Sequence, residues 1–193
     1  DMVLPEILAL TWPEYYDRIH SRTAILDGGL EIYLRTIRDV QPFVLSGLPD
    51  DFDSPRANAI RGLLPRGSEP DYGPLGRLRA NGSSVRIFQD KSLRKLLDSL
   101  LPEIHDAQTD SDAISLGKEL WDVVLAERYL GPAVASRLLT LANPGRFFSA
   151  NGKSIPDLSK FLGIATSRLK EWRGYSEALM RLWSSSWFNS ACP

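Results

Sequence analysis

The chain has 193 residues, of which 43% are hydrophobic and 24% charged, and its formal net charge is −1. A chain of this length and composition can bury a core of its own. Its single cysteine, Cys192, excludes an intrachain disulfide, and no apolar stretch approaches the ~20 residues of a membrane-spanning helix. The first residues also lack the basic and apolar regions of a signal peptide, so we expect a cytoplasmic protein that does not enter a membrane.

The small net charge hides four blocks of alternating sign. Residues 1–55 hold 4 Lys and Arg against 10 Asp and Glu, and residues 96–131 hold 2 against 8. Residues 56–95 hold 9 basic residues against 3 acidic ones, and residues 132–193 hold 8 against 3. The two basic blocks could form one basic face if they fold together, or the blocks could neutralise each other across an internal interface.

Capping and breaking residues delimit the expected elements in the first half of the chain. Thr11 and Glu14 form a capping-box pattern around Pro13, which predicts a helix from there to about Leu26. The other elements expected in this half are helices at 30–41, 54–64 and 91–101, a Gly- and Pro-rich loop at 65–83, and one short strand at 84–88.

Specific residues mark the expected ends of these helices. Ser54 before a proline, and Asp90 before leucines at helical spacing, predict N-terminal caps. Pro42 and Pro102 are expected to stop the helices that precede them.

In the second half, a polar acidic connector at 105–112 precedes a further series of helices. These are expected at 112–130, 132–141, 155–162, 166–172 and 175–183, with a turn at 143–145 and an extended stretch at 146–150. The pattern predicts an all-α or nearly all-α domain with at most a minor pair of short strands, either as one unit or as two lobes, 1–104 and 112–193. The terminal run of aromatic residues has no obvious stop, so we expect the domain to belong to a longer protein.

One short motif points towards a function. The segment Ile155–Trp172 reads IPDLSKFLGIATSRLKEW and resembles the helix-turn-helix of bacterial DNA-binding proteins. Gly163 stands at the turn, where a positive φ is needed, Thr166 would cap the second helix, and Leu169 would pack it inward. The likeness covers 18 residues, and Ser159 and Pro156 depart slightly from the usual pattern.

The resemblance implies that the start of the second helix faces DNA, with base contacts from that helix and phosphate contacts around it. The implied contact residues are Lys153, Lys160, Ser167, Arg168, Lys170 and Arg173. The alternative is that the same segment is only a compact helical corner inside a larger domain.

A fainter resemblance covers residues 143–148, 151–154 and 158–163, which look like helical segments of bacterial restriction and related defence proteins. It implies an accessory or target-sensing module. On that interpretation the helix-turn-helix likeness carries less weight.

A third resemblance concerns catalysis. Pro49-Asp50, followed by Gln89-Asp90-Lys91, loosely matches the PD-(D/E)xK nuclease pattern in its Gln-x-Lys variant. In that family the acidic and amide groups hold a divalent metal and the lysine supports the attacking water. The chemistry needs a sheet that brings Asp50 near Gln89, and the acidic residues around Asp50 equally fit a cap of the following helix.

Other catalytic patterns are lacking in the sequence. Two histidines and one cysteine are too few for a zinc site, and no nucleophile elbow, Walker loop or dinucleotide fingerprint is present. We therefore expect a non-catalytic module, without metal or cofactor, that binds DNA or positions a partner on DNA in a bacterial restriction or defence system. The alternatives are a protein-interaction module that uses Trp183, Trp187 and Phe188, and the metal-dependent nuclease.

Overall fold

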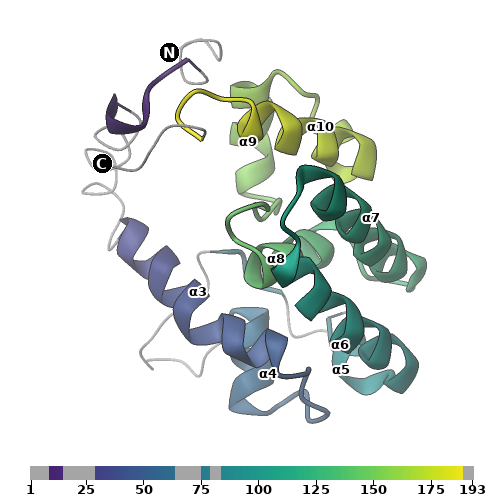
Figure 1. The fold of residues 1–193 in the computed structure, drawn as a ribbon. Helices are drawn as coiled ribbons and strands as arrows, with labels where there is room; N and C mark the ends of the chain where they lie inside the picture. The colour runs from purple at the N-terminus through teal and green to yellow at the C-terminus, as the bar shows by residue number, and fades with distance from the viewer. Residues whose placement is uncertain (1–8, 15–28, 64–74, 79–83, 189–193) are drawn as a thin grey trace. The chain divides into compact units, whose positions relative to one another are not determined.

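The computed structural model describes residues 9–14, 29–63, 75–78 and 84–188, and every regular element within these ranges is a helix (Figure 1). The predicted all-α fold is therefore confirmed. The helices are α3 (Gly29–Leu45), α4 (Pro55–Arg61), α5 (Arg86–Gln89), α6 (Lys91–Asp106), α7 (Asp110–Ala126), α8 (Pro132–Ala142), α9 (Ser154–Leu162), the 3-10 helix η2 (Arg168–Lys170) and α10 (Trp172–Trp183). None of them combines the length and apolar character that crossing a bilayer requires.

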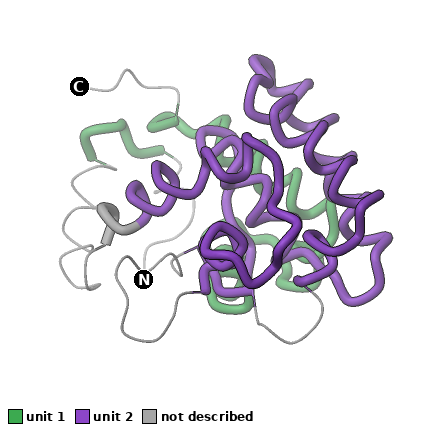
Figure 2. The backbone as a smooth tube through the Cα atoms, turned by 90° about the horizontal axis from the view of Figure 1, so that it is seen from below, with its two compact units in different colours: residues 1–31, 152–193 green, residues 32–151 purple. Residues whose placement is uncertain are grey.

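Two compact units share the chain (Figure 2). Unit 1 comprises residues 1–31 and 152–193, and unit 2 comprises residues 32–151. The lobes considered from the sequence, 1–104 and 112–193, are a different division. The polar connector at 105–112 lies inside unit 2, where it joins the packed helices α6 and α7.

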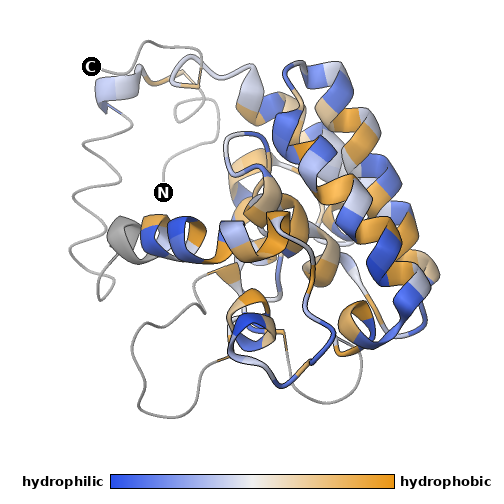
Figure 3. Cartoon of the chain, turned by 60° about the horizontal axis from the view of Figure 1, so that its bottom comes forward, coloured by the Kyte–Doolittle hydropathy of each residue, from blue (hydrophilic) through white to orange (hydrophobic). Residues whose placement is uncertain are grey.

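Amphipathic helices build the core of unit 2. Helices α6, α7 and α8 pack on one another, and the apolar residues of α6 and α7 form stripes along each of these two helices (Figure 3). The fully buried side chains include Leu97, Leu101, Ile104, Leu120, Val124, Leu138, Leu139 and Leu141. Because α8 is buried along nearly its whole length, it is the central helix of this unit.

The predicted caps at Ser54 and Asp90 are confirmed. Ser54 Oγ accepts a hydrogen bond of 3.2 Å from the backbone N–H of Ala57, and Asp90 accepts two of 3.0 Å from the first turn of α6. Near the start of the chain, the N–H of Thr11 donates to the Glu14 carboxylate at 2.8 Å, which is one of the two hydrogen bonds of a capping box. The Thr11 hydroxyl also donates to this carboxylate, at 2.9 Å, a contact that the capping box does not include. The helix expected to follow falls mostly on residues 15–28, outside the described residues.

The two prolines expected to stop helices do not do so. Helix α3 continues past Pro42 to Leu45, and α6 continues past Pro102 to Asp106. An interior proline removes one hydrogen bond and costs about 3 kcal/mol. In both helices the apolar face continues beyond the proline, with Val44 and Ile104 fully buried, and this burial offsets the loss.

The strand expected at 84–88 is also wrong, because residues 86–89 form the single-turn helix α5. Val85, Ile87 and Phe88 are all buried, so the apolar residues do not alternate between two faces. A five-residue segment with three apolar side chains fits a buried helical turn as well as a strand. The long helix α7 begins at Asp110 rather than Asp112, because Thr109 caps it by accepting from the N–H of Asp112.

Arg137 of α8 joins three parts of unit 2. Its guanidinium donates to the carbonyl oxygens of Ile60 at 2.5 Å, Ala59 at 3.3 Å and Gly76 at 2.6 Å. Ala59 and Ile60 belong to the last turn of α4, where carbonyls are short of helical partners and attract a cation. The Ala59 carbonyl also accepts from the N–H of Gly62. The side chain is fully buried, and burial lowers the pKa of Arg137 to about 9, so it remains cationic at neutral pH.

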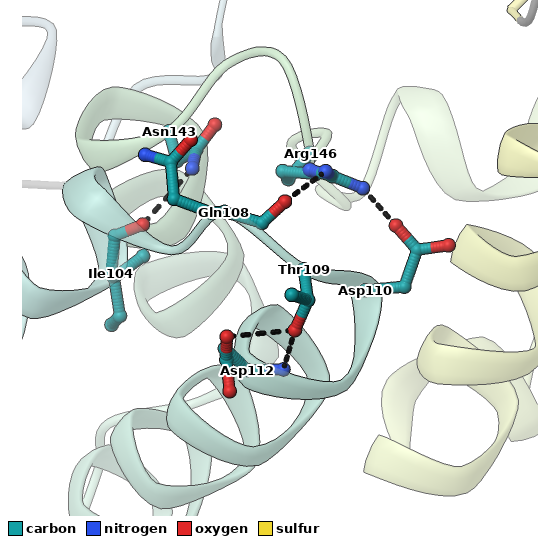
Figure 4. A network of polar contacts seen from close by, with 7 residues as sticks. All are labelled: Ile104, Gln108, Thr109, Asp110, Asp112, Asn143 and Arg146. Atoms are coloured by element: carbon teal, nitrogen blue, oxygen red, sulfur yellow. Dashed lines mark hydrogen bonds and ion pairs between the residues drawn. The ribbon is translucent and has the colours of Figure 1, made fainter.

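A polar network caps the C-terminal end of α6 (Figure 4). Asn143, in the turn after α8, donates to the carbonyls of Ile104 and His105 at 3.0 and 3.3 Å. Arg146 donates to the Gln108 carbonyl at 2.9 Å and pairs with Asp110. The predicted turn at residues 143–145 is thus present, and the segment that resembles defence proteins begins with a helix-capping role.

Candidate nucleic-acid interface

The first half of the helix-turn-helix-like segment has the geometry that its sequence predicts. Helix α9 ends at Gly163, which has a φ of 59°. Only glycine adopts this left-handed conformation without steric strain, so the turn depends on Gly163. Ile155 and Leu162 of α9 are buried, and so is Ile164 just after the turn.

The second half differs from the prediction. Instead of an α-helix beginning near Thr166, the chain forms the three-residue 3-10 helix η2, and α10 begins only at Trp172. The N–H groups of Lys170 and Glu171 bond to carbonyls three residues back, and Glu171 itself is extended with φ −109° and ψ 148°. A recognition helix over 166–172 is therefore not formed.

Close packing of α10 onto η2 explains this break. Gly174 of α10 faces the backbone of Arg168, and a Cβ at that glycine would lie 2.1 Å from the Arg168 carbonyl oxygen. In an uninterrupted helix over 166–183, the backbone at Arg168 could not lie against Gly174 in this way. Leu169 is fully buried beneath the contact, as predicted, together with Tyr175 and Leu179 of α10.

Glu177 of α10 forms ion pairs that connect η2 with α10. Its carboxylate accepts from Arg168 at 2.6 Å and from Arg181 at 2.7 Å, so one anion neutralises two of the local arginines. Arg181 also donates to the carbonyl of Leu162, near the end of α9. Arg168 is thus engaged within the corner, although its side chain remains 48% exposed.

All six predicted contact residues are exposed to solvent, and all belong to unit 1. They are Lys153, Lys160, Ser167, Arg168, Lys170 and Arg173. Among the described residues, the side chains of Lys160, Lys170 and Arg173 form no hydrogen bond or ion pair. Residues 152–193 hold six Lys and Arg against three Asp and Glu, so the local charge is positive.

The residues of the competing hypotheses lie in other surroundings. Trp183 is only 6% exposed and belongs to the core of α10, whereas Trp187 and Phe188 are half-buried and pack edge to face at 6.1 Å. A surface built on all three aromatics is therefore not present.

The nuclease pattern lacks its structural basis in the described part of the chain. Gln89 ends a helix rather than a strand, Asp90 is occupied as a cap, and no sheet joins them to Asp50. The carboxylate of Asp51 accepts from the N–H of Asp53, as in a loop that leads into a helix. No group of three or more potential metal-ligating side chains occurs among the residues that were placed.

Three further residues shape this site and were not predicted from the sequence. Gly174 could have been recognised, because a glycine inside a helix lowers stability unless a close contact requires it. Glu177 and Arg181 stand four residues apart, which is the spacing of an ion pair on one helix face. The pairing of Glu177 with Arg168 had no signal in the sequence, since it depends on how η2 folds back.

Comparison with known proteins provides no relative from which a function could be transferred. No family model matches the chain, and neither the curated proteins nor the solved structures contain a match. The functional case therefore depends on the chain's own residues.

Proposed function

We propose that this chain is a non-catalytic helical module that binds duplex DNA through the exposed face of the corner at 153–173. The observation that carries the proposal is the set of three exposed cations, Lys160, Lys170 and Arg173, that have no partner among the described residues. Arginines such as Arg137 and Arg146 are instead engaged by carbonyls or carboxylates within the fold. Side chains left in solvent on a positively charged segment are suited to phosphate oxygens.

The geometry favours contacts to the DNA backbone over contacts to base edges. A recognition helix enters the major groove with several residues of its first turns. Here Ser167, Arg168 and Lys170 lie on a single 3-10 turn, and Arg168 is paired with Glu177. We therefore expect weak sequence preference and a binding energy dominated by counterion release. The likeness of residues 143–163 to restriction and defence proteins is in keeping with a DNA-directed role.

Salt dependence tests the proposal. Each phosphate contact contributes about 0.9 log units of affinity per log unit of salt, so three contacts predict a slope of about −2.7. Fluorescence anisotropy with a labelled duplex of random sequence, in stepwise increasing salt, measures this slope. Undetectable binding at low salt would refute the proposal.

A matched pair of double variants locates the site. Lys160→Gln with Lys170→Gln should weaken duplex binding and reduce the slope by about 1.8, because two contacts are lost. The control is Arg38→Gln with Lys118→Gln, which removes the same charge from exposed positions in unit 2. Equal effects of the two double variants would mean that only overall charge matters and that the corner is not the interface.

The non-catalytic part of the proposal has its own test. Plasmid DNA incubated with the protein and Mg²⁺ or Mn²⁺ should remain supercoiled. Metal-dependent nicking that is abolished by Asp50→Ala and by Lys91→Ala would instead establish the nuclease.

A further inference from the structure

An exposed aromatic residue in a strained backbone conformation lies in the turn between α7 and α8. Tyr129 is 67% exposed, more than any other large apolar side chain of the described residues. Its φ is 74°, and no other non-glycine residue with a described backbone has a positive φ. The turn is closed by a hydrogen bond of 3.1 Å from the N–H of Leu130 to the carbonyl of Glu127.

This position would be occupied more easily by glycine. A positive φ at the third residue is typical of a type II turn, where Gly and Asn are favoured, and for a bulky residue it is a genuine outlier. The tyrosine ring is largely in solvent, so its contacts within the fold compensate for little of the strain energy of this backbone conformation. Strained residues persist where the conformation serves a function, and the observed outlier therefore prompts a functional hypothesis.

One cation lies over the ring, and others occur in the neighbouring segments of unit 2. The guanidinium of Arg128 lies over it, 4.6 Å from the centroid, and Glu127 next to it is paired with Arg86 at 3.0 Å. The ion pair places α5 and the start of α6 beside the turn. Residues 84–95 and 127–130 together hold five Lys and Arg against Asp90 and Glu127, and Asp90 is already occupied as the cap of α6.

We propose that Tyr129 is a stacking platform for an unpaired base of a nucleic-acid strand. The base would lie on the ring face that Arg128 does not cover, and the neighbouring phosphates would meet the exposed Lys91, whose side chain forms no hydrogen bond or ion pair among the described residues. Aromatic rings bind single strands in this way with little sequence preference, because every base has a π-face. This site lies wholly in unit 2 and is independent of the proposed duplex-binding corner in unit 1.

A comparison of oligonucleotides with and without bases tests the stacking directly. The probes are oligo(dT), oligo(U) and an abasic deoxyribose strand of equal length, which carries the same phosphates. The unmodified protein should bind oligo(dT) more tightly than the abasic strand. Tyr129→Ala should weaken oligo(dT) binding by about 5- to 100-fold and leave abasic binding nearly unchanged. The oligo(U) arm shows whether a ribose strand is accepted equally.

Further variants separate stacking from other roles. Tyr129→Phe should retain binding, since a base needs only the ring, and Tyr33→Ala, which removes another exposed tyrosine, should have no effect. Tyr129→Gly should lose base binding while its melting temperature stays level or rises, because the turn is relieved of strain. A merely structural tyrosine would show the opposite, with lower stability and unchanged discrimination between the strands.

Certain results would overturn the proposal. Equal affinity for oligo(dT) and the abasic strand, or unchanged binding by Tyr129→Ala, would show that bases do not stack there and would leave a protein partner as the remaining use of this surface. The double variant of Lys160 and Lys170 should keep its preference for oligo(dT) over the abasic strand, even if its overall affinity for phosphates falls. If it lost this preference together with duplex binding, one shared site in unit 1 would explain both, and the site at Tyr129 would be refuted.

Discussion

The junction of α4 with α8 in unit 2 and the corner at 153–173 in unit 1 both draw on basic blocks of the sequence, but they use their cations differently. In unit 2, Arg56, Arg61, Arg94 and Arg137 all donate to main-chain carbonyls. Burial lowers the pKa of Arg61 and Arg137, yet both guanidinium groups have oxygen partners within the fold. In unit 1, Lys160, Lys170 and Arg173 remain in solvent.

This difference shows why a charge count does not identify a binding surface. The block at 56–95 has the larger excess of basic residues, but several of its arginines are occupied by helix termini and loop carbonyls. Arginine has five donors in a fixed fork and suits such positions, whereas lysine carries a compact, strongly hydrated charge. The cations relevant to a ligand are those that the fold does not use itself.

The largest expected effect comes from Arg137. Arg137→Met removes the guanidinium donors of three carbonyls, two of which belong to the buried residues Ala59 and Ile60, and we expect a loss of about 3–5 kcal/mol in the free energy of unfolding. Urea denaturation followed by circular dichroism measures it. Arg38→Met, at a side chain that is 74% exposed, should change stability by less than about 0.5 kcal/mol. If the two variants were equally stable, Arg137 would not be the structural cation described above.

The contact between η2 and α10 should be the next most sensitive feature. Gly174→Ala forces a Cβ against the Arg168 carbonyl, so α10 and η2 must separate, at about 1–3 kcal/mol. Duplex binding should weaken as well, because Lys170 moves with η2. Gly152→Ala is the matched control, since a Cβ there meets no atom within 4 Å. Unchanged melting temperatures for both variants would contradict the close approach of α10 to η2 at Gly174.

The cap of α6 is expected to have a smaller effect. Asp90→Ala removes the acceptor for two N–H groups and should lower the free energy of unfolding by about 1 kcal/mol. Asp90→Ser should recover most of the loss, because serine is also a good cap. Thermal unfolding measures both variants. A fully stable Asp90→Ala protein would remove the physical reason for assigning this residue to the fold rather than to a nuclease site.

Glu177→Gln is expected to have the smallest effect on stability, and it is the most specific test of the difference between the two regions. Glu177→Gln breaks ion pairs with Arg168 and Arg181 that are partly exposed, so the stability loss should stay below about 1 kcal/mol. Duplex DNA binding should become tighter, because one negative charge is lost and two arginines are released. Anisotropy titrations at two salt concentrations measure the change. Weaker binding would instead mean that Glu177 positions Arg168 for its ligand.

Local signals in the sequence predicted local structure well. The caps at Ser54 and Asp90 and the glycine turn at Gly163 were correct, because each depends on one side chain and the backbone within three residues of it. The inward orientation of Leu169 was also correct, but it comes from the packing of η2 against α10 and not from the α-helix expected at 166–172. The helical periodicity of α6, α7 and α8 was sufficient to predict the all-α fold.

Features that depend on tertiary packing could not be predicted in this way. Pro42 and Pro102 normally end helices, and only the burial beyond each proline explains why α3 and α6 continue. The recognition helix failed because Gly174 brings α10 against Arg168, a contact that helical periodicity does not encode. The acceptors of Arg137 lie 61 to 78 residues earlier in the chain, so its role was invisible to any local pattern.

The cap that Asn143 and Arg146 place on the end of α6 sets an order of events during synthesis. Both residues follow their acceptors by 36 to 39 positions. A ribosome adds about 5–20 residues per second, so roughly 2–8 seconds separate the emergence of α6 from that of its cap. Helices form within microseconds. A hairpin of α6 and α7 therefore has time to assemble before α8 is available to cover its apolar face.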